Sequence, residues 1–289
     1  MEKPRTPIEN ALVRSTVRLL AGKRGQPQSS VGTGFYYKVQ NESGELTKVF
    51  VVTNKHVVRD ADEIQFVLPY APALDDLDEA GQPKGRVDAT LAWPLQGNLI
   101  QHPDPNIDLC AIDITSPISH ILNAGNQLRC MIIDSGWLPE PEHKKLIRDI
   151  EHVLVIGYPR GLWDNHNNMP ISRVGTTATH PLAAYQGRTN FLIDVAAFQG
   201  SSGSPVFTYE APMFRTAKGA YTPGTKVQFV GVVWGVVEWS VEGEMKEIEI
   251  PSSLKKQVPV LTTSLNLAVA LHAESVRAID RLAFEKRPS

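Results

Sequence analysis

Hydrophobic and polar residues alternate along most of the chain with the two-residue period of β-strands. Short segments rich in Gly, Pro, Asn and Ser separate these stretches and are typical of turns. Strands are expected at residues 11–21, 32–40, 47–53, 64–68, 89–93, 109–114, 153–158, 191–195, 204–208, 228–237 and 265–271. Such a series of short strands predicts an all-β protein.

Four stretches break this period. Residues 274–286 carry apolar side chains at a helical spacing, which predicts a C-terminal helix. Residues 69–88 and 209–226 are expected to form long surface loops. Residues 115–150 are interpreted as a connection between two groups of strands, with one short helix at 140–150.

The composition narrows the class of protein. The chain has 289 residues, of which 42% are hydrophobic, and this is enough for one large or two small domains with packed cores. Its 29 basic and 31 acidic residues leave a formal net charge of −2. Because this charge produces no strong field of either sign, neither a nucleic acid nor an anionic membrane is expected as a partner.

The N-terminal residues and the cysteines indicate a compartment. The first residues contain no continuous apolar core, so no secretory signal is expected, and no apolar run approaches the length that spans a bilayer. The chain has two cysteines, Cys110 and Cys130, and we expect Cys110 to be a core side chain rather than half of a bridge. These features favour a reducing, cytoplasmic location.

The stretch Ala197–Pro205, AFQGSSGSP in one-letter code, is the first candidate for chemistry. Its glycines permit a tight turn, and a serine on such a turn can present its hydroxyl beside N–H groups that face a developing oxyanion. Taken alone, the stretch could be an ordinary Gly/Ser turn, which is the more frequent meaning of such a sequence. Ser202 is therefore a candidate nucleophile whose assignment depends on partners elsewhere in the chain.

Two further segments supply those partners. His56 follows an apolar run, and Asp108 opens the alternating strand 109–114. A hydroxyl nucleophile needs a base, and the base needs an acid that fixes its tautomer. Asp113 lies five positions after Asp108 and is expected to face the other way. The chain order His56, Asp108, Ser202 differs from the orders of subtilisins and of α/β-hydrolases.

The residues around these three positions resemble the motifs of a known family. Thr53–Val58 (TNKHVV), Ile107–Ile112 (IDLCAI) and Asp194–Pro205 (DVAAFQGSSGSP) resemble the histidine, aspartate and serine motifs of trypsin-like serine proteases with the chymotrypsin fold. Val31–Phe35 (VGTGF) resembles the strand that precedes the histidine in that family. Val155–Pro159 (VIGYP) resembles the opening of its second barrel.

The likeness extends over roughly residues 10–275 and is strongest to the disulfide-free, HtrA-like bacterial branch, without a PDZ domain. It implies two six-stranded antiparallel β-barrels that form one peptidase domain over residues 1–289. Barrel 1 is expected at about residues 10–118, the connection at 119–150, barrel 2 at 151–272 and the C-terminal helix at 273–286. The helix is expected to pack on the second barrel.

The resemblance also implies an activity. It predicts a serine endopeptidase in which His56 is the base, Asp108 orients that base and Ser202 forms an acyl-enzyme. The N–H groups of Gly200 and Ser202 match the donors of the family's oxyanion hole. No metal or other cofactor is expected, because the sequence contains neither a His-Glu-x-x-His motif nor a P-loop or dinucleotide fingerprint.

Two residues in the serine motif depart from the family pattern. Ser201 stands where an Asp or Asn usually precedes the nucleophile, so the ion pair that activates secreted trypsins after N-terminal trimming is not expected. Ser204 replaces a glycine and also excludes the esterase motif G-x-S-x-G. Bacterial relatives often keep the oxyanion loop disordered, so this loop could rest in its active shape or in a latent shape that a partner or ligand orders.

Other positions of the family pattern concern substrate binding. The candidate substrate-binding residues are Ala196, Val233, Trp234, Gly235, Leu267 and Ala268. The first of these occupies the position where trypsins carry a charge-selecting aspartate, and residues 233–235 match the strand that pairs with an extended peptide. A small or medium apolar residue is therefore predicted on the acyl side of the cut.

A second class of function stays open on the sequence alone. A catalytically silent relative could use the same groove to bind peptides or a regulatory protein partner. The intact set of His56, Asp108 and Ser202 favours an enzyme with a protein or peptide substrate, because a pure binding module has no chemical need for all three groups. The loops at 69–88 and 209–226 are candidate contacts for a regulatory partner.

Overall fold

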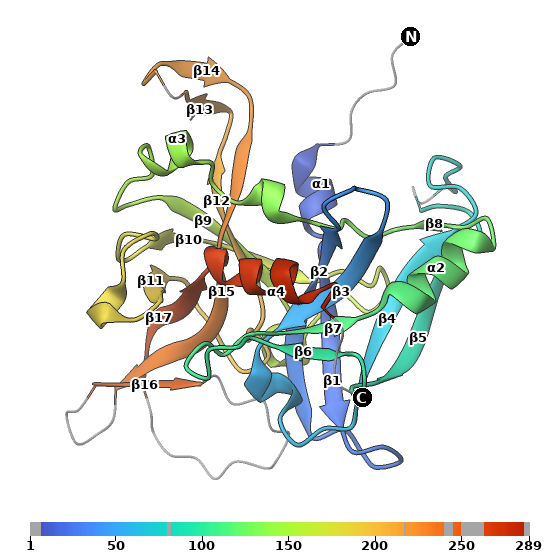
Figure 1. The fold of residues 1–289 in the computed structure, drawn as a ribbon. Coiled ribbons are helices and arrows are strands. Elements are labelled where there is room, and N and C mark those ends of the chain that lie inside the picture. The colour runs from blue at the N-terminus through green and yellow to red at the C-terminus, as the bar shows by residue number, and fades with distance from the viewer. Residues whose placement is uncertain (1–6, 80–81, 217, 240–244, 250–262, 286–289) are drawn as a thin grey trace.

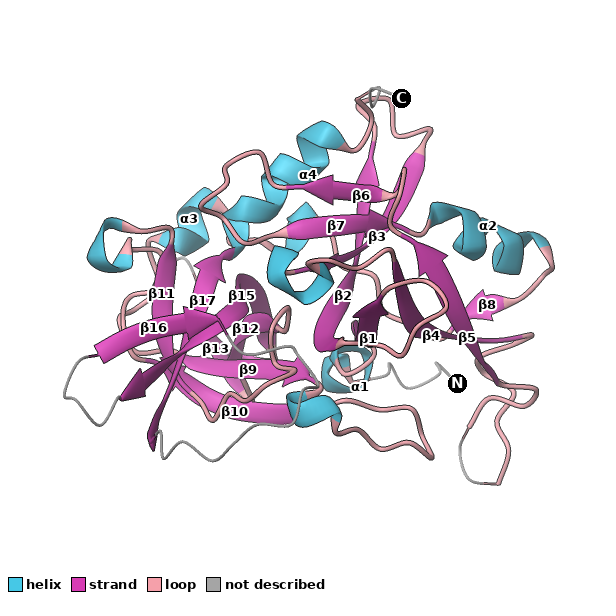
Figure 2. Cartoon of the chain, turned by 90° about the horizontal axis from the view of Figure 1, so that it is seen from below, coloured by secondary structure: helices cyan, strands magenta, loops and turns pink. Residues whose placement is uncertain are grey.

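The computed structural model describes residues 7–79, 82–216, 218–239, 245–249 and 263–285. These residues form a mostly β structure in which two antiparallel sheets lie side by side with short helices packed around them (Figures 1 and 2). The all-β prediction is confirmed at this level. Within the described ranges, no helix combines the length and the apolar character needed to cross a membrane.

The first sheet is built from residues 16–128, so its last strand lies within the expected connection. Its strands are β1 (Thr16–Gly22), β2 (Ser30–Gln40), β3 (Thr47–Thr53), β4 (Glu63–Ala71), β5 (Val87–Pro94), β6 (Leu99–Gln101), β7 (Cys110–Asp113) and β8 (Gln127–Leu128). They follow the order β5-β4-β1-β2-β3-β7-β6, and β8 pairs with β4. Among the described residues no pairing joins β5 to β6, so this sheet is not closed by hydrogen bonds.

The second sheet closes on itself. Its strands are β9 (His152–Gly157), β10 (Ile171–Thr177), β11 (Asn190–Asp194), β12 (Pro205–Glu210), β15 (Lys226–Trp239), β16 (Met245–Glu249) and β17 (Thr263–His272). They follow the order β12-β9-β10-β11-β17-β15-β16, and an additional β12–β15 pairing completes a ring of six strands. A small separate hairpin, β13 (Met213–Arg215) with β14 (Tyr221–Pro223), occupies part of the predicted loop at 209–226.

The expectation of two six-stranded barrels therefore holds for the second sheet and needs correction for the first. The first sheet has eight strands and an open edge at β5. None of the β5 residues is fully buried, because this strand pairs only with β4 and exposes much of its surface. The short strands β6 and β8 contain three and two residues, too few for a pattern of alternation to be recognised.

Short helices replace strand or loop at several predicted positions. The α-helices are α1 (Ile8–Leu12), α2 (Thr115–Asn123), α3 (Pro141–Lys144) and α4 (Arg277–Leu282), and the 3₁₀ helices are η1 (Lys55–Val58), η2 (Ser135–Trp137), η3 (Pro159–Gly161), η4 (Tyr185–Gly187) and η5 (Ala273–Val276). The expected strand at 11–21 thus begins only at Thr16, because the preceding residues bury Leu12 from a helical turn.

The remaining differences lie in the connection and at the C-terminus. Helix α2 was not predicted, and its Ile118 and Ile121, three positions apart, bury one face against the first sheet. The helix expected at 140–150 is reduced to the four residues of α3. The predicted C-terminal helix is present as η5 followed by α4, while the last position of the predicted range, residue 286, lies outside the described residues.

One hydrophobic cluster joins the two sheets. Phe35 of β2 and Phe229 of β15 have ring centroids 5.3 Å apart in an edge-to-face arrangement. Phe207 of β12 extends this contact, with its centroid 5.7 Å from that of Phe229. The C-terminal segment covers the cluster and contacts both sheets, since the Tyr37 hydroxyl of β2 donates to Asp280 Oδ1 of α4 at 2.8 Å. This shared core fixes the position of one sheet relative to the other.

Candidate active site

His56, Asp108 and Ser202 lie together where the two sheets meet. His56 is on η1, directly after β3, and only 7% of its surface is exposed. Its Nε2 is 2.9 Å from Ser202 Oγ, and its Nδ1 contacts Asp108 Oδ2. The other carboxylate oxygen of Asp108 accepts the backbone N–H of His56 at 3.0 Å. The imidazole is therefore fixed from both sides.

Strand register explains how residues 52 positions apart come together. In the antiparallel β3–β7 pair, Thr53 lies opposite Cys110. Residues that follow Thr53 and residues that precede Cys110 therefore leave the sheet at the same end. Asn54 strengthens this junction, because its side-chain amide donates to the backbone carbonyl of Asp108 at 2.6 Å.

Two glycines shape the turn that carries Ser202. Gly200 has φ +88° and Gly203 has φ +86°, a region that favours glycine. A Cβ at Gly203 would lie 1.9 Å from the Thr33 carbonyl oxygen, and one at Gly200 would lie 2.4 Å from the Tyr158 carbonyl oxygen. The turn is thus pressed against backbone on both sides. The Thr33 N–H also donates to the Ser202 carbonyl at 2.8 Å.

The same turn leaves two N–H groups available. The carbonyl of Gln199 accepts the Arg160 N–H, and the carbonyl of Gly200 accepts the Thr33 hydroxyl at 2.8 Å. Because C=O and N–H point in opposite directions across a trans peptide, the Gly200 N–H faces away from Arg160. Within the described part of the chain, neither the Gly200 N–H nor the Ser202 N–H has a hydrogen-bond acceptor.

The two unusual serines of the motif have different surroundings. The Ser201 hydroxyl accepts the Phe198 N–H at 3.3 Å, so it lies within its own loop. The Ser204 hydroxyl is buried, has no hydrogen-bond partner and lies 2.0 Å from the position that a Cβ would take at Gly157. A side chain larger than hydrogen at residue 157 would therefore displace the start of β12.

The candidate substrate residues divide into two groups. Trp234 and Leu267 are half-buried, and Trp234 lines a cavity of about 480 Å³ together with Asp108 and Asn190. Ala196 is also half-buried, and its carbonyl accepts a hydrogen bond from the Arg173 guanidinium.

The second group is built into the sheet. The Val233 carbonyl accepts the Gly203 N–H at 2.8 Å, and the Val233 N–H donates to the Ser204 carbonyl at 2.9 Å. Gly235 pairs with β17 on one side and with β16 on the other, and Ala268 is fully buried. The strand edge at Gly235, which the sequence interpretation assigned to a substrate peptide, is thus occupied by β16.

Sequence reasoning missed several residues that surround the reactive turn. Thr33 and Arg160 hold the carbonyls of Gly200 and Gln199, and nothing in a one-letter pattern signals such backbone contacts. Two guanidinium groups contact the Phe198 ring, with Arg160 at 5.3 Å and Arg173 at 4.9 Å from its centroid. Tyr158 completes the group, because its N–H donates to the Thr33 hydroxyl at 3.0 Å.

The cysteines take no part in this site as nucleophiles. Both are free thiols, in agreement with the expectation that they do not form a bridge. Burial raises the pKa of Cys110 well above its usual range and raises that of Cys130 to about 12. In the described residues, no group of three or more His, Cys, Asp or Glu side chains is placed to hold a metal ion.

Comparisons with known proteins give one family match. A model described as a trypsin-like peptidase domain matches residues 32–211. No curated protein matches the chain.

Solved structures that are similar to the chain include two forms of one protease. The active form of the Rv3671c protease from M. tuberculosis is 16% identical, with 98% of this chain and 86% of that chain covered and a TM-score of 0.47. Its inactive form is 16% identical, with 96% and 91% covered and a TM-score of 0.40. A serine endoprotease from Yersinia pestis is 17% identical, with 86% and 64% covered and a TM-score of 0.40.

Proposed function

The chain belongs to the trypsin-like peptidase family, and from this premise we propose that it is a serine endopeptidase acting through His56, Asp108 and Ser202. The observation that carries the proposal is the continuous contact from Asp108 through His56 to Ser202 Oγ, with 2.9 Å between Nε2 and Oγ. This is the reach that a general base needs to take a hydroxyl proton.

In the proposed first half-reaction, Ser202 Oγ attacks the carbonyl carbon of a peptide bond while His56 Nε2 takes the hydroxyl proton. Asp108 holds the imidazole in the tautomer with hydrogen on Nδ1 and stabilises the imidazolium that forms. The N–H groups of Gly200 and Ser202 donate to the oxyanion of the tetrahedral intermediate. One such donor contributes about 3 kcal/mol of transition-state stabilisation.

The second half-reaction returns the enzyme to its starting state. His56 gives its proton to the leaving amine, and the first product departs from the acyl-enzyme. A water molecule then loses a proton to His56 and attacks the ester carbon, which releases the second product and restores the Ser202 hydroxyl. Every proton in this sequence moves through His56 Nε2, which agrees with its burial and its single orientation between two partners.

The substrate is proposed to be a protein or peptide that lies across the cavity beside Asp108. Trp234 and Leu271 supply apolar surface there, and Arg188 and Asp104 supply charge at its rim. A small or medium apolar residue on the acyl side of the cut remains the prediction at Ala196. Because both cysteines are free, we further propose that the enzyme acts in a reducing, cytoplasmic compartment.

Latency is a finer part of the proposal. The oxyanion loop depends on the hydrogen bond from the Arg160 N–H to Gln199, and Arg160 itself has φ +54°, an uncommon conformation for a residue with a side chain. We propose that a ligand or a protein partner that stabilises residues 158–161 favours the active loop, and that loss of this hydrogen bond gives the latent one.

The proposal is tested by cleavage of an unfolded protein substrate, with new N-termini identified by mass spectrometry. Wild type is expected to generate defined cleavage sites and Ser202→Ala none. Ser204→Ala is the matched control, since its buried hydroxyl has no hydrogen-bond partner, and it is expected to cleave like wild type. Equal inertness of wild type and Ser202→Ala, with peptide binding retained in both, would support the alternative of a catalytically silent binding module.

A further inference from the structure

A cavity of about 230 Å³ lies outside the catalytic site, between the first sheet and the segment that follows β9. Strands β1 and β4 form one wall, and Tyr158, Trp163 and Met169 form the other. Arg129, just after β8, closes one end. The cavity has room for a small group and several water molecules, and it is smaller than the usual pocket for a drug-sized molecule.

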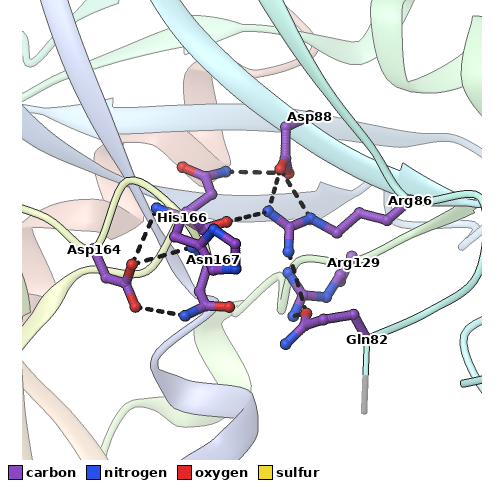
Figure 3. Close-up of polar contacts among 8 residues, drawn as sticks. Gln82, Arg86, Asp88, Arg129, Asp164, His166 and Asn167 are labelled. Carbon is purple, nitrogen blue, oxygen red and sulfur yellow. Dashed lines mark hydrogen bonds and ion pairs between the residues drawn. The ribbon is translucent and has the colours of Figure 1, made fainter. Parts of the chain in front are cut away.

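Three arginines line this cavity: Arg14 and Arg18 from the β1 segment, and Arg129. No Asp or Glu lines it, and within the described ranges no carboxylate is in ion-pair distance of these three guanidinium groups. A fourth arginine, Arg86, lies beside Arg129 but is bound to Asp88, with 2.8 Å from Nε to the carboxylate (Figure 3). The cavity is therefore lined by three guanidinium groups that form no ion pair among the described residues.

Burial makes this charge costly. Arg129 is only 7% exposed, and its Nη2 donates to the neutral side chain of Gln82 rather than to an anion (Figure 3). Burial, and secondarily the charges of Arg14 and Arg86, lowers the pKa of Arg129, and the charge of Asp88 opposes this only in part. Burial, and secondarily Arg86, likewise lowers the pKa of Arg14. Charged groups in such surroundings are normally paired.

Several hydrogen-bonding atoms at the cavity also lack partners. The Nε atoms of Arg14 and Arg18 are buried without an acceptor. Thr16, another lining residue, is only 6% exposed, and its hydroxyl has no hydrogen-bond partner. The Arg18 guanidinium lies 4.2 Å from the Trp163 ring centroid, and this stacking holds the side chain in place without satisfying its N–H groups. These groups are donors without acceptors, and a negatively charged acceptor in the cavity would satisfy them.

We propose that this cavity binds a compact oxyanion, the phosphate or carboxylate group of a small ligand. A planar guanidinium matches both groups with paired hydrogen bonds, and three of them around one cavity match an ion with several oxygens. The Thr16 hydroxyl supplies a further donor. The volume fits the anionic group and a short attached portion rather than a whole nucleotide or peptide.

The place of the cavity gives this ligand a role in regulation. Tyr158 lines the cavity, and its backbone carbonyl and the backbone nitrogens of Arg160 and Gly161 are the atoms that a Cβ at Gly200 would meet. An anion that holds residues 158–163 against β1 is thus the ligand we assign to the activation of the oxyanion loop. This role rests on the proposed function, whereas binding of the anion does not, so the two are tested with separate readouts.

Binding is tested with the inactive Ser202→Ala chain, in which catalysis cannot interfere. Inorganic phosphate and acetate are titrated by calorimetry, and the midpoint of thermal unfolding is recorded in each anion and in chloride at the same ionic strength. Phosphate or acetate is expected to bind at one site and to raise the midpoint above that in chloride. Tighter binding of phosphate would indicate a phosphorylated ligand, and tighter binding of acetate would indicate a carboxylate ligand.

Arg18→Gln is the test variant and Arg24→Gln the matched control. Arg24 is exposed and does not line the cavity. Loss of one charge-assisted hydrogen bond is expected to weaken binding in Arg18→Gln by about tenfold or more, while Arg24→Gln binds like its parent. In chloride, Arg18→Gln is expected to unfold at the parent temperature or above, because it removes an unpaired charge, and this separates a binding role from a structural one.

Two results would overturn the site. One is that phosphate and acetate shift the unfolding midpoint no more than chloride does. The other is that Arg18→Gln and Arg24→Gln respond to the anions alike. Activation is read from the rate of covalent labelling of Ser202 in the wild-type chain: the bound anion is expected to increase it. Binding without any change in that rate would contradict the regulatory role and leave the site itself established.

Discussion

The Thr33 hydroxyl of β2 donates a hydrogen bond of 2.8 Å to the carbonyl of Gly200, two residues before Ser202 and 167 positions away in sequence. The same hydroxyl accepts the N–H of Tyr158 at 3.0 Å. Thr33 belongs to the first sheet, while Tyr158 directly follows β9 of the second sheet and Gly200 lies in the turn that precedes β12. One side chain therefore connects the two sheets at the oxyanion loop.

Replacement of Thr33 by valine is expected to lower kcat with little change in KM. It leaves the Gly200 carbonyl and the Tyr158 N–H without partners, which costs about 1–3 kcal/mol in stability and releases the oxyanion loop. Thr33→Ser keeps the hydroxyl and is expected to retain most of the wild-type kcat. Steady-state kinetics with a fluorogenic peptide distinguishes these results. A loss of stability in Thr33→Val without a loss of kcat would show that Thr33 has only a structural role.

Gly200→Ala is expected to reduce kcat by about 10²–10³, the cost of losing an oxyanion donor. A Cβ there would lie 2.4 Å from the Tyr158 carbonyl oxygen and would force the loop to move. Gly219→Ala is the matched control, since Gly219 has a comparable φ of +79° and nothing within 4 Å of a Cβ. The control is expected to keep wild-type kcat. Similar losses of kcat in both variants would mean that backbone strain alone causes the effect.

Asp108→Asn is expected to lower kcat by about 10⁴ while leaving the fold intact. An asparagine can occupy the same space, but its amide favours the wrong tautomer of His56 and cannot stabilise the imidazolium. Kinetics at substrate concentrations above and below KM checks this, with the unfolding temperature as a control for structure. A loss of less than tenfold would show that Asp108 does not act as the partner of His56.

The fold could be predicted where strands are long and alternate clearly. Residues 47–53 match β3 at both ends, because its apolar run is buried between neighbouring strands. β10 was missed, because its sequence ISRVGTT is largely polar and six of its seven residues are not fully buried. The open edge at β5 also could not be predicted, since closure of a sheet depends on pairings between residues far apart in sequence.

For the site, the motifs identified which residues come together, whereas the contacts around those residues could not be predicted. His56, Asp108 and Ser202 were found from their motifs, and the structure brings them into contact. Their catalytic roles remain proposals. The contacts of Thr33 and Arg160 could not be predicted, because they join these residues to the carbonyls of Gly200 and Gln199, which are far away in sequence. Val233 was assigned to substrate on its motif, but its backbone groups support the serine turn.

The C-terminal helix provides a prediction about pH. Burial raises the pKa of Asp280, although the hydrogen bond from Tyr37 and the charge of Arg277 oppose this. A carboxyl whose pKa is higher in the folded state stabilises the fold at low pH, and this contribution is lost as pH rises through the raised value. Asp280→Asn keeps an acceptor for the Tyr37 hydroxyl. Because asparagine does not ionise, the variant does not lose stability at this position as pH rises.

The unfolding temperature of Asp280→Asn, relative to wild type, is therefore expected to increase between about pH 4 and pH 7, by roughly 2 °C after allowance for solvent screening. Thermal unfolding followed by circular dichroism at a series of pH values measures this difference. A difference that stays constant over this range, or that decreases as pH rises, would contradict the assignment of a raised pKa to Asp280.

The central claim is that Ser202 is a nucleophile activated by His56, and site-resolved labelling with a fluorophosphonate probe tests it most directly. The account predicts one covalent adduct per chain, located on Ser202 by peptide mass spectrometry. It also predicts no adduct in Ser202→Ala and a greatly slowed reaction in His56→Ala. A wild-type chain that stays unlabelled, or an adduct that forms equally fast in His56→Ala, would contradict the account.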